Sequence, residues 1–182
     1  VEYKYSSYQD DSTSWCYNGE KSNCDTYGRL YTWSAAMDSA AQFTENDGTK
    51  CGIGKTCTPN TPHRGICPEG WHVPTNEEYS TLYTTIGGTD YAGIYLKSTD
   101  EWASNADTQG IDLYGFSVLP AGYRDYDGNF YGVGNYARLW SASDYESTYA
   151  YDQHFYFGFA NVYQYFNFKY NGFFLRCLQD SN

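Results

Sequence analysis

Three kinds of residue in this chain could carry out chemistry: histidines, closely spaced carboxylates and cysteines. The histidines are His63, His72 and His154, and none belongs to a Gly-x-Ser-x-Gly or His-Glu-x-x-His motif. His63 lies in a loop and says little. His72 lies in a short apolar stretch and is expected to be structural, whereas His154 lies among aromatic residues and is a candidate ligand contact. We therefore expect no enzymatic activity.

Oxygen-bearing side chains alternate in one short segment. Asp125, Asp127 and Asn129 are spaced as at the start of a calcium loop. An EF-hand also needs a distal bidentate glutamate, and the chain has Tyr136 at that spacing. Asp127-Gly128 between alternating residues is also a strong hairpin signal, and we prefer that interpretation. No cofactor is expected, and calcium near residues 125–129 is the alternative.

The six cysteines contain no Cys-x-x-Cys pair and have no histidine close enough to complete a zinc finger. Disulfides are the better interpretation, and they indicate an oxidising compartment and a secreted or cell-surface protein. Six cysteines allow many connectivities, and the sequence does not choose among them. If close neighbours pair, the bonds are Cys16–Cys24, Cys51–Cys57 and Cys67–Cys177.

Length and charge restrict the class of protein. The 182 residues suit a single domain, residues 1–182, that can bury its own core. The net charge is −11, so nucleic acid is not an expected partner, because such binding needs clustered lysine and arginine. No apolar run approaches the ~18 residues of a membrane helix, so no membrane insertion is expected. The chain opens on Val1 without a signal peptide, which we interpret as a mature or trimmed form.

The elements that must position these residues are two helices followed by strands. Thr32 is a candidate N-cap for a helix that ends at residues 46–48. The apolar face of that helix would hold Trp33, Ala36, Met37, Ala40 and Ala41. Thr75 and Glu78 form a capping box before a second apolar stripe of Tyr79, Leu82, Tyr83 and Ile86, closed by Gly87-Gly88. A third short helix is expected over residues 92–97, whereas residues 1–30 look irregular with a weak edge strand at 1–5.

Most expected strands follow the helices. They cover residues 70–74 and 115–120, a hairpin over 123–131, and residues 139–143, 151–159, 162–169 and 173–178. Helices followed by a run of antiparallel strands predict an α+β fold.

Half of the 22 tyrosines and eight of the ten phenylalanines lie in residues 120–178. Strand alternation places Phe155, Phe157 and Phe159 on one face and Asp152, His154 and Tyr156 on the other, and Phe166 and Phe168 also alternate with polar residues. We predict that the phenylalanines form core and that the tyrosine and asparagine faces are wet, with the composition of antibody binding loops. The alternative is that exposed tyrosines merely solvate a sheet, because tyrosine favours strands. The candidate ligand-binding residues are Asn129, Tyr131, Asn135, Tyr136, Tyr145, Tyr149, Asp152, His154, Tyr156, Tyr163, Tyr165 and Tyr170.

Four segments carry a resemblance to a known family. CDTYGRLYTWSAAM, GICPEGWHVPTNEEY, GFSVLPAGYRDYDGNFYGVGNYARLWSAS and GFFLRCL, in this order, resemble the Fibrobacter succinogenes major paralogous domain over nearly the whole chain. The resemblance implies a disulfide-stapled, C-type lectin-like fold with two helices packed on small antiparallel sheets. It also implies a secreted or surface-attached bacterial protein without assigned enzyme activity that functions in binding or adhesion. Trp71, Leu119, Trp140 and Cys177 would be scaffold.

The chain also departs from calcium-dependent sugar-binding lectins. It lacks the Glu-Pro-Asn or Gln-Pro-Asp triplet and the Trp-Asn-Asp triplet, so calcium-bridged sugar binding is not expected. Residues 129–170 are similar in composition to the variable sites of lectin-like receptors diversified by retroelements, which would make the surface hypervariable.

These observations favour a non-catalytic ligand-binding or adhesion domain that takes a glycan or a protein through its tyrosine- and asparagine-rich C-terminal surface. The alternative is an assembly module, such as a pilus or fibre subunit, that uses the tyrosine face for subunit contacts. The ligand and the oligomeric state stay open.

Overall fold

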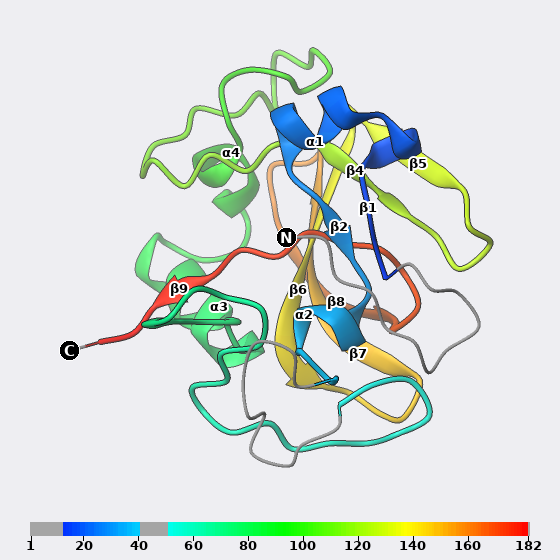
Figure 1. Cartoon of the computed structure of the whole chain (residues 1–182). Helices are drawn as coiled ribbons and strands as arrows, with labels where there is room; N and C mark the ends of the chain where they lie inside the picture. The colour runs from blue at the N-terminus through cyan, green and yellow to red at the C-terminus, as the bar shows by residue number, and fades with distance from the viewer. Residues whose placement is uncertain (1–12, 41–50, 182) are drawn as a thin grey trace.

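The computed structural model describes residues 13–40 and 51–181, and within them it confirms a mixed α+β architecture (Figure 1). The expected edge strand at residues 1–5 lies outside the described residues. The helical elements are η1 (Tyr17–Gly19), α1 (Lys21–Tyr27), α2 (Trp33–Ala36), α3 (Asn76–Thr85) and α4 (Ala92–Leu96). The strands are β1 (Ser14–Trp15), β2 (Leu30–Tyr31), β3 (Trp71–His72), β4 (Ala121–Arg124), β5 (Phe130–Val133), β6 (Tyr136–Asp144), β7 (Tyr149–Tyr156), β8 (Tyr163–Phe168) and β9 (Leu178–Gln179). In the described part of the chain, no helix is long and apolar enough to cross a membrane.

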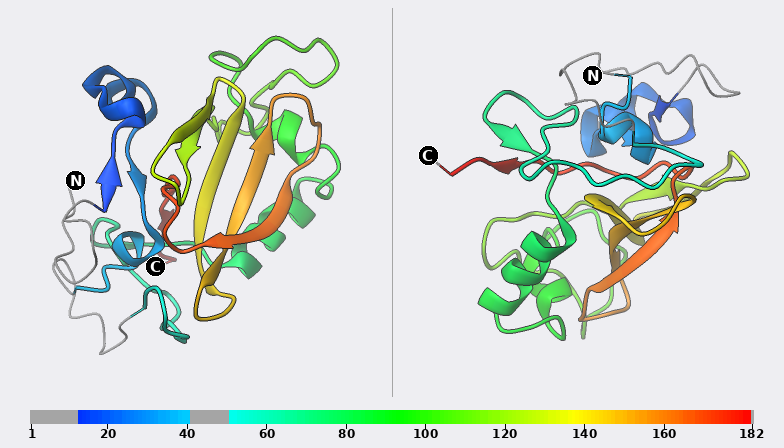
Figure 2. Two further views of the ribbon diagram at one scale, coloured as in Figure 1. Left: turned by 90° about the vertical axis from the view of Figure 1, so that its right-hand side faces the viewer. Right: turned by 90° about the horizontal axis from the view of Figure 1, so that it is seen from below.

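A curled five-stranded sheet forms the centre of the molecule, in the order β5-β4-β6-β7-β8. The expected hairpin is confirmed, because β4 and β5 pair antiparallel around a turn in which Gly128 has φ 86°. Helices α3 and α4 lie behind this sheet in the left view of Figure 2. No helix of the described residues crosses in front of β6, β7 and β8 in that view.

The last part of the chain joins several elements. Phe173 pairs with Tyr31 of β2 and Phe174 pairs with Leu139 of β6, while β9 pairs antiparallel with β3. We expected residues 173–178 to extend the antiparallel set. Instead, the Phe174 bridge is parallel and β9 belongs to a separate two-stranded sheet. This segment therefore connects the N-terminal strands, the central sheet and the β3 region.

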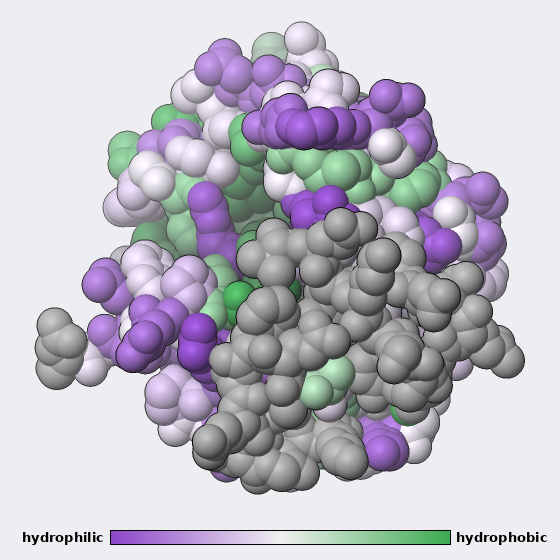
Figure 3. Space-filling model, viewed as in Figure 1, coloured by the Kyte–Doolittle hydropathy of each residue, from purple (hydrophilic) through white to green (hydrophobic). Residues whose placement is uncertain are grey.

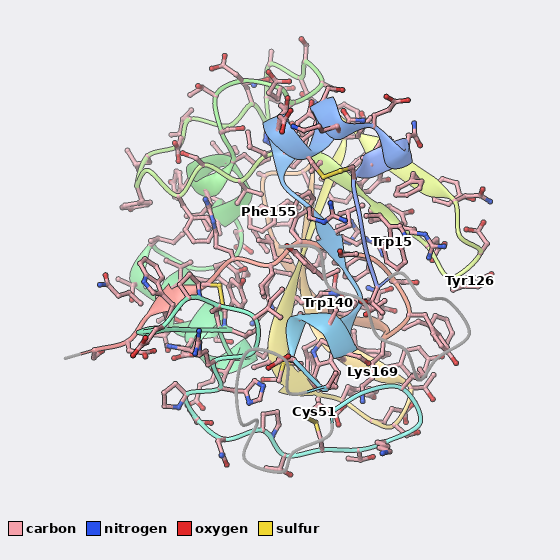
Figure 4. The ribbon with its side chains drawn as sticks, viewed as in Figure 1. Trp15, Cys51, Tyr126, Trp140, Phe155 and Lys169 are labelled. Carbon is pink, nitrogen blue, oxygen red and sulfur yellow. A yellow bond between two sulfur atoms is a disulfide. The ribbon has the colours of Figure 1, made fainter. Side chains whose placement is uncertain are left out.

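Two apolar clusters pack against the sheet. One lies between α3, α4 and the face of β6 and β7 that carries Ala137, Leu139 and Phe155. The other joins Trp33 of α2 and Phe173 to Trp140 of β6. Trp140 and Phe173 rings lie 4.3 Å apart, and the Trp140 Nε1 donates a hydrogen bond to the Tyr31 carbonyl at 2.7 Å (Figure 4). Trp140 is therefore part of the scaffold, as the family resemblance implied.

The capped helix is confirmed. In α3 the Thr75 hydroxyl accepts from the Glu78 backbone N–H, and the Glu78 carboxylate accepts from the Thr75 N–H at 2.7 Å. Tyr79, Tyr83 and Ile86 are buried on its inner face. The expected third helix is confirmed as α4.

The N-terminal helices differ from expectation. The helix after Thr32 was expected to continue to residue 46, but α2 ends at Ala36. Asp38 has φ 51°, a left-handed conformation that an α-helix cannot contain, and residues 41–50 lie outside the described part. Residues 17–27, expected to be irregular, form η1 and α1.

Residues 115–120 were predicted as a buried strand, and this was wrong. Only Val118 forms an isolated bridge, with Lys97, and Ser117 has φ 51°. The Asp112 carboxylate accepts from the Ser117 backbone N–H at 2.7 Å, which holds the segment in a turn rather than an extended strand.

The three disulfides are confirmed as Cys16–Cys24, Cys51–Cys57 and Cys67–Cys177. The first two close local loops of 8 and 6 residues, and the third spans 110 residues. Such bonds are typical of proteins in oxidising compartments.

Candidate functional site

Six aromatic rings form a continuous row across the central sheet, which we call the aromatic band. Successive centroids lie between 4.6 and 6.0 Å apart. These spacings suit aromatic pairs in direct contact. From β5 to β8, the band consists of Tyr131, Tyr123, Tyr136, Tyr156, Phe159 and Tyr163.

Strand alternation places the band on the face of the sheet that points away from α3 and α4. On β6 and β7 the neighbours Ala137 and Phe155 pack toward those helices, so Tyr136 and Tyr156 point the opposite way. The ends of the band are open, with Tyr131 40% exposed and Tyr163 48% exposed. The band therefore offers flat apolar faces with hydroxyl groups at their edges.

A polar cluster lies beside the centre of the band. Arg138 follows Tyr136 by two residues, and its guanidinium carbon lies 4.1 Å from the Tyr123 ring centroid. Asn167 of β8 donates to the Asp152 carboxylate at 2.7 Å and accepts from Arg138 Nη1 at 3.4 Å. The cluster thus connects β6, β7 and β8 and holds Arg138 against Tyr123.

Asp152 was expected to be a surface ligand contact, and the structure corrects this. Asp152 lies on β7, between β6 and β8, and its side chain is fully buried within the polar cluster. Burial raises the pKa of Asp152 to about 6, and the hydrogen bond from Asn167 opposes that shift. We therefore assign Asp152 to the support of the band.

His154 is half-buried and pairs across the strands with Arg138. Its ring lies 5.5 Å from the Tyr136 ring, at the edge of the band. Burial, assisted by the Arg138 charge, lowers the pKa of His154 to about 4. The imidazole is consequently neutral at physiological pH.

Tyr145 and Tyr149 do not join the band. The Tyr145 ring stacks on Phe166 at 4.0 Å, and Tyr149 lies 4.5 Å from Phe168. Phe166 and Phe168 are only half-buried, so this is a second aromatic group rather than closed core. Phe159, which was expected in the core, is 44% exposed because the chain turns after β7.

Asn129 belongs to the β4–β5 turn, and Tyr131 lies in β5 directly after it. The Tyr131 hydroxyl donates to the Asp127 carboxylate at 2.7 Å, and the Asn129 backbone N–H donates to it at 2.8 Å. These bonds lower the pKa of Asp127, with the Asn129 backbone bond contributing most. Within residues 13–40 and 51–181, no group of three or more histidine, cysteine, aspartate or glutamate side chains could hold a metal ion.

The remaining candidates lie at three places. Tyr165 is 54% exposed on β8, on the same face as Tyr163. Tyr170 is 50% exposed in the turn that follows β8. Asn135 is half-buried in the β5–β6 turn, where its carbonyl accepts from the Phe157 N–H at 2.8 Å. Tyr126 was not among these candidates, but it lies at the tip of the β4–β5 hairpin (Figure 4) and is 67% exposed.

One family matches almost the whole sequence. The family model described as Fibrobacter succinogenes major domain (Fib_succ_major) matches residues 2–179. The chain belongs to this family. No curated protein and no solved structure matches the chain.

In this Fibrobacter succinogenes major domain, sequence reasoning missed two members of the band and its main support. Tyr123 and Phe159 complete the row of rings, and Arg138 holds Tyr123. Arg138 lies two residues after Tyr136 on β6, so period-two alternation could have placed it on the same face as the tyrosine. For Phe159 the same alternation was misleading, because it grouped this residue with Phe155 and Phe157 although β7 ends at Tyr156.

Proposed function

We propose that this domain is a non-catalytic ligand-binding or adhesion module of a secreted or surface-attached bacterial protein. The observation that carries the proposal is the aromatic band, which crosses all five strands of the sheet on the face opposite α3 and α4. Tyrosine offers a large contact area at low conformational entropy cost. Its ring can stack on a sugar while its hydroxyl forms a hydrogen bond at the edge of the contact. The ligand is a glycan or a protein.

We also propose that the fold is C-type lectin-like. Support comes from the helices packed on one face of small sheets and from the pairing of β2 with Phe173, which brings early and late segments together. An experimental structure superposed on known lectin-like domains would test this assignment.

The proposed binding surface is tested by alanine substitutions at the ends of the band. Tyr131→Ala and Tyr163→Ala should each weaken the strongest signal on a glycan array about three- to tenfold, because a stacked ring contributes roughly 0.5–1.5 kcal/mol. Tyr156 is a poorer probe, because it is half-buried against Tyr136 and its loss would disturb the sheet.

Tyr114→Ala is the matched control, since Tyr114 is 53% exposed and lies outside the band. If the array is silent, the same variants are compared in pull-downs of extracellular protein. The band would be rejected as the binding surface if ligand binding were unchanged in both band variants, or if Tyr114→Ala weakened it equally.

A second candidate function is assembly into a fibre or pilus, and a separate apolar surface favours it. Ile111, Leu113 and Tyr114 are more than half exposed. Their segment is joined to α4 by backbone hydrogen bonds, and the Tyr95 and Tyr114 ring centroids lie 6.2 Å apart. Tyr91 adds a further exposed ring. Exposed apolar groups of this kind mark interaction surfaces. Leu113→Asp should then abolish self-association in sedimentation velocity without changing glycan binding.

A further inference from the structure

A pocket lies on the opposite side of β6 from the aromatic band. Its volume is about 170 Å³, and its wall includes Val118, Leu119, Leu139 and Phe174. Leu139 alternates with Arg138 along β6, so the two surfaces occupy opposite faces of one strand. Figure 3 shows green apolar surface inside a hollow of the molecule, in the view of Figure 1.

The charged side chain that lines this pocket is an arginine. Arg176 lines it together with the hydroxyl-bearing residues Tyr27 and Ser117. Two carboxylates outside the lining are bonded to these residues. The exposed Glu101 accepts from the Tyr27 hydroxyl at 3.0 Å, and Asp112 accepts from the Ser117 hydroxyl and backbone N–H. A guanidinium is thus the charged group of the wall itself.

Arg176 has hydrogen-bonding capacity to spare. Its Nη1 donates to the Phe116 carbonyl, and its guanidinium carbon lies 4.8 Å from the Phe116 ring centroid. Among the described residues, no carboxylate forms an ion pair with it. A guanidinium carries five N–H donors in a planar fork that fits a carboxylate, so most of its donors remain for a ligand. Contact with Phe116 fixes its orientation.

Volume limits what the apolar part can hold. A dry cavity of about 150 Å³ lined by aliphatic and aromatic side chains accommodates benzene. This pocket is of similar size and adds one cation at its wall. One ring or a short alkyl chain fills it, and a larger apolar group does not.

We propose that this pocket binds a small free carboxylic acid with one apolar group, whose carboxylate is held by Arg176. The aromatic ring or alkyl chain lies against Leu119, Leu139 and Phe174. This site is independent of the aromatic band, and neither proposal depends on the other.

The test compares two isosteric probes, phenylacetate and phenylacetamide, by NMR titration of the whole domain. Wild type should bind phenylacetate at least about tenfold more tightly, because a hydrogen bond to a charged group contributes roughly 1.5–3 kcal/mol. Arg176→Gln should remove this preference while phenylacetamide still binds, which shows that the pocket remains folded. Shifted resonances should include those of Leu119 and Leu139. Tyr131→Ala is the matched control and should bind phenylacetate as wild type does.

Three results would overturn the proposal. They are equal affinity of wild type for the two probes, absence of binding at millimolar concentration, and a carboxylate preference that survives Arg176→Gln. Each leaves the glycan-array result for the band unchanged, so failure of one site is distinguishable from failure of the other.

Discussion

His72 lies between two carboxylates, one on the nearby helix α3 and one in the segment after β9. Its Nδ1 lies 2.6 Å from Asp180 Oδ1 and its Nε2 lies 2.9 Å from Glu78 Oε1. Burial by itself would lower the pKa of His72, but the hydrogen bonds to Asp180 and Glu78 and their charges outweigh it, so the pKa is raised. A doubly protonated ring donates to both partners at once. His72 is structural, as expected, and joins β3, α3 and the segment after β9.

This contact should make stability depend on pH. A raised folded pKa stabilises the fold fully below the unfolded value of about 6.5, and the gain is lost as pH rises through the folded pKa. The melting temperature of wild type should therefore exceed that of His72→Gln by more at pH 5.5 than at pH 9. Because both carboxylates are partly exposed, the difference should be about 1 kcal/mol or less, or roughly 2–4 °C.

Asp180→Asn should show the same trend at smaller amplitude, and Glu77→Gln, on the exposed side of α3, should show none. A constant difference between wild type and His72→Gln across the pH range would contradict the paired, protonated histidine.

Sequence alternation sorted some aromatic residues correctly at this scale. Phe155 is buried and Tyr163 and Tyr165 are exposed, as β7 and β8 require. Alternation failed for Asp152, because a polar side chain was taken as a sign of solvent although Asn167 satisfies part of its hydrogen bonding inside the sheet. The residue that lies opposite a polar group on the next strand depends on the register of the two strands. The sequence of a single strand does not determine that register.

At the scale of elements, Lys97 connects two loops to each other. Its side chain is buried, and its Nζ donates to the carbonyls of Thr108 at 2.7 Å, Tyr156 at 3.2 Å and Phe159 at 3.1 Å. Burial lowers the pKa of Lys97 to about 8. The Lys97 ammonium group therefore helps to hold the turn between β7 and β8, which carries Phe159 of the band. The Thr108 hydroxyl adds a second contact, because it donates to the Phe157 carbonyl at 2.7 Å.

Lys97→Ala should destabilise the domain by about 2–4 kcal/mol, because it leaves several buried carbonyls unpaired. The melting temperature should fall by roughly 4 °C or more. Lys55→Ala, at an exposed side chain, is the control and should change it little. An unchanged melting temperature for Lys97→Ala in a thermal scan would show that water replaces the ammonium without cost.

Elements with local signals could be predicted, and those fixed by distant contacts could not. The α3 capping box and the Asp127-Gly128 hairpin are encoded within a few residues and were found. The short α2 and the turn at Ser117 depend on positive φ angles at Asp38 and Ser117, residue types that adopt several conformations. No pattern in a single sequence indicates that choice.

At the scale of the whole molecule, the disulfides divide into two local bonds and one long-range bond. Cys67–Cys177 closes 110 residues, whereas Cys51–Cys57 closes 6. In the chain-entropy model the long bond stabilises the fold by about 4–5 kcal/mol and the short one by roughly 2 kcal/mol. The sequence alone did not choose among the possible connectivities, and these pairings were expected only if close neighbours pair.

Replacement of Cys67 and Cys177 by serine should therefore cost about 2–3 kcal/mol more than the same change at Cys51 and Cys57. Urea unfolding of both double variants under non-reducing conditions measures the difference. Equal unfolding midpoints and slopes would contradict a dominant role for the long-range bond.

The C-terminal segment sets the order in which this chain can acquire its structure. Phe173 and Phe174 pair with β2 and β6, and β9 pairs with β3, so residues made late complete contacts with residues made early. A growing chain lacks these partners until residue 179 has been synthesised, and cooperative folding is deferred to that moment. The contacts that join the C-terminal segment to β2, β6 and β3 are therefore the last that the chain can form during its synthesis.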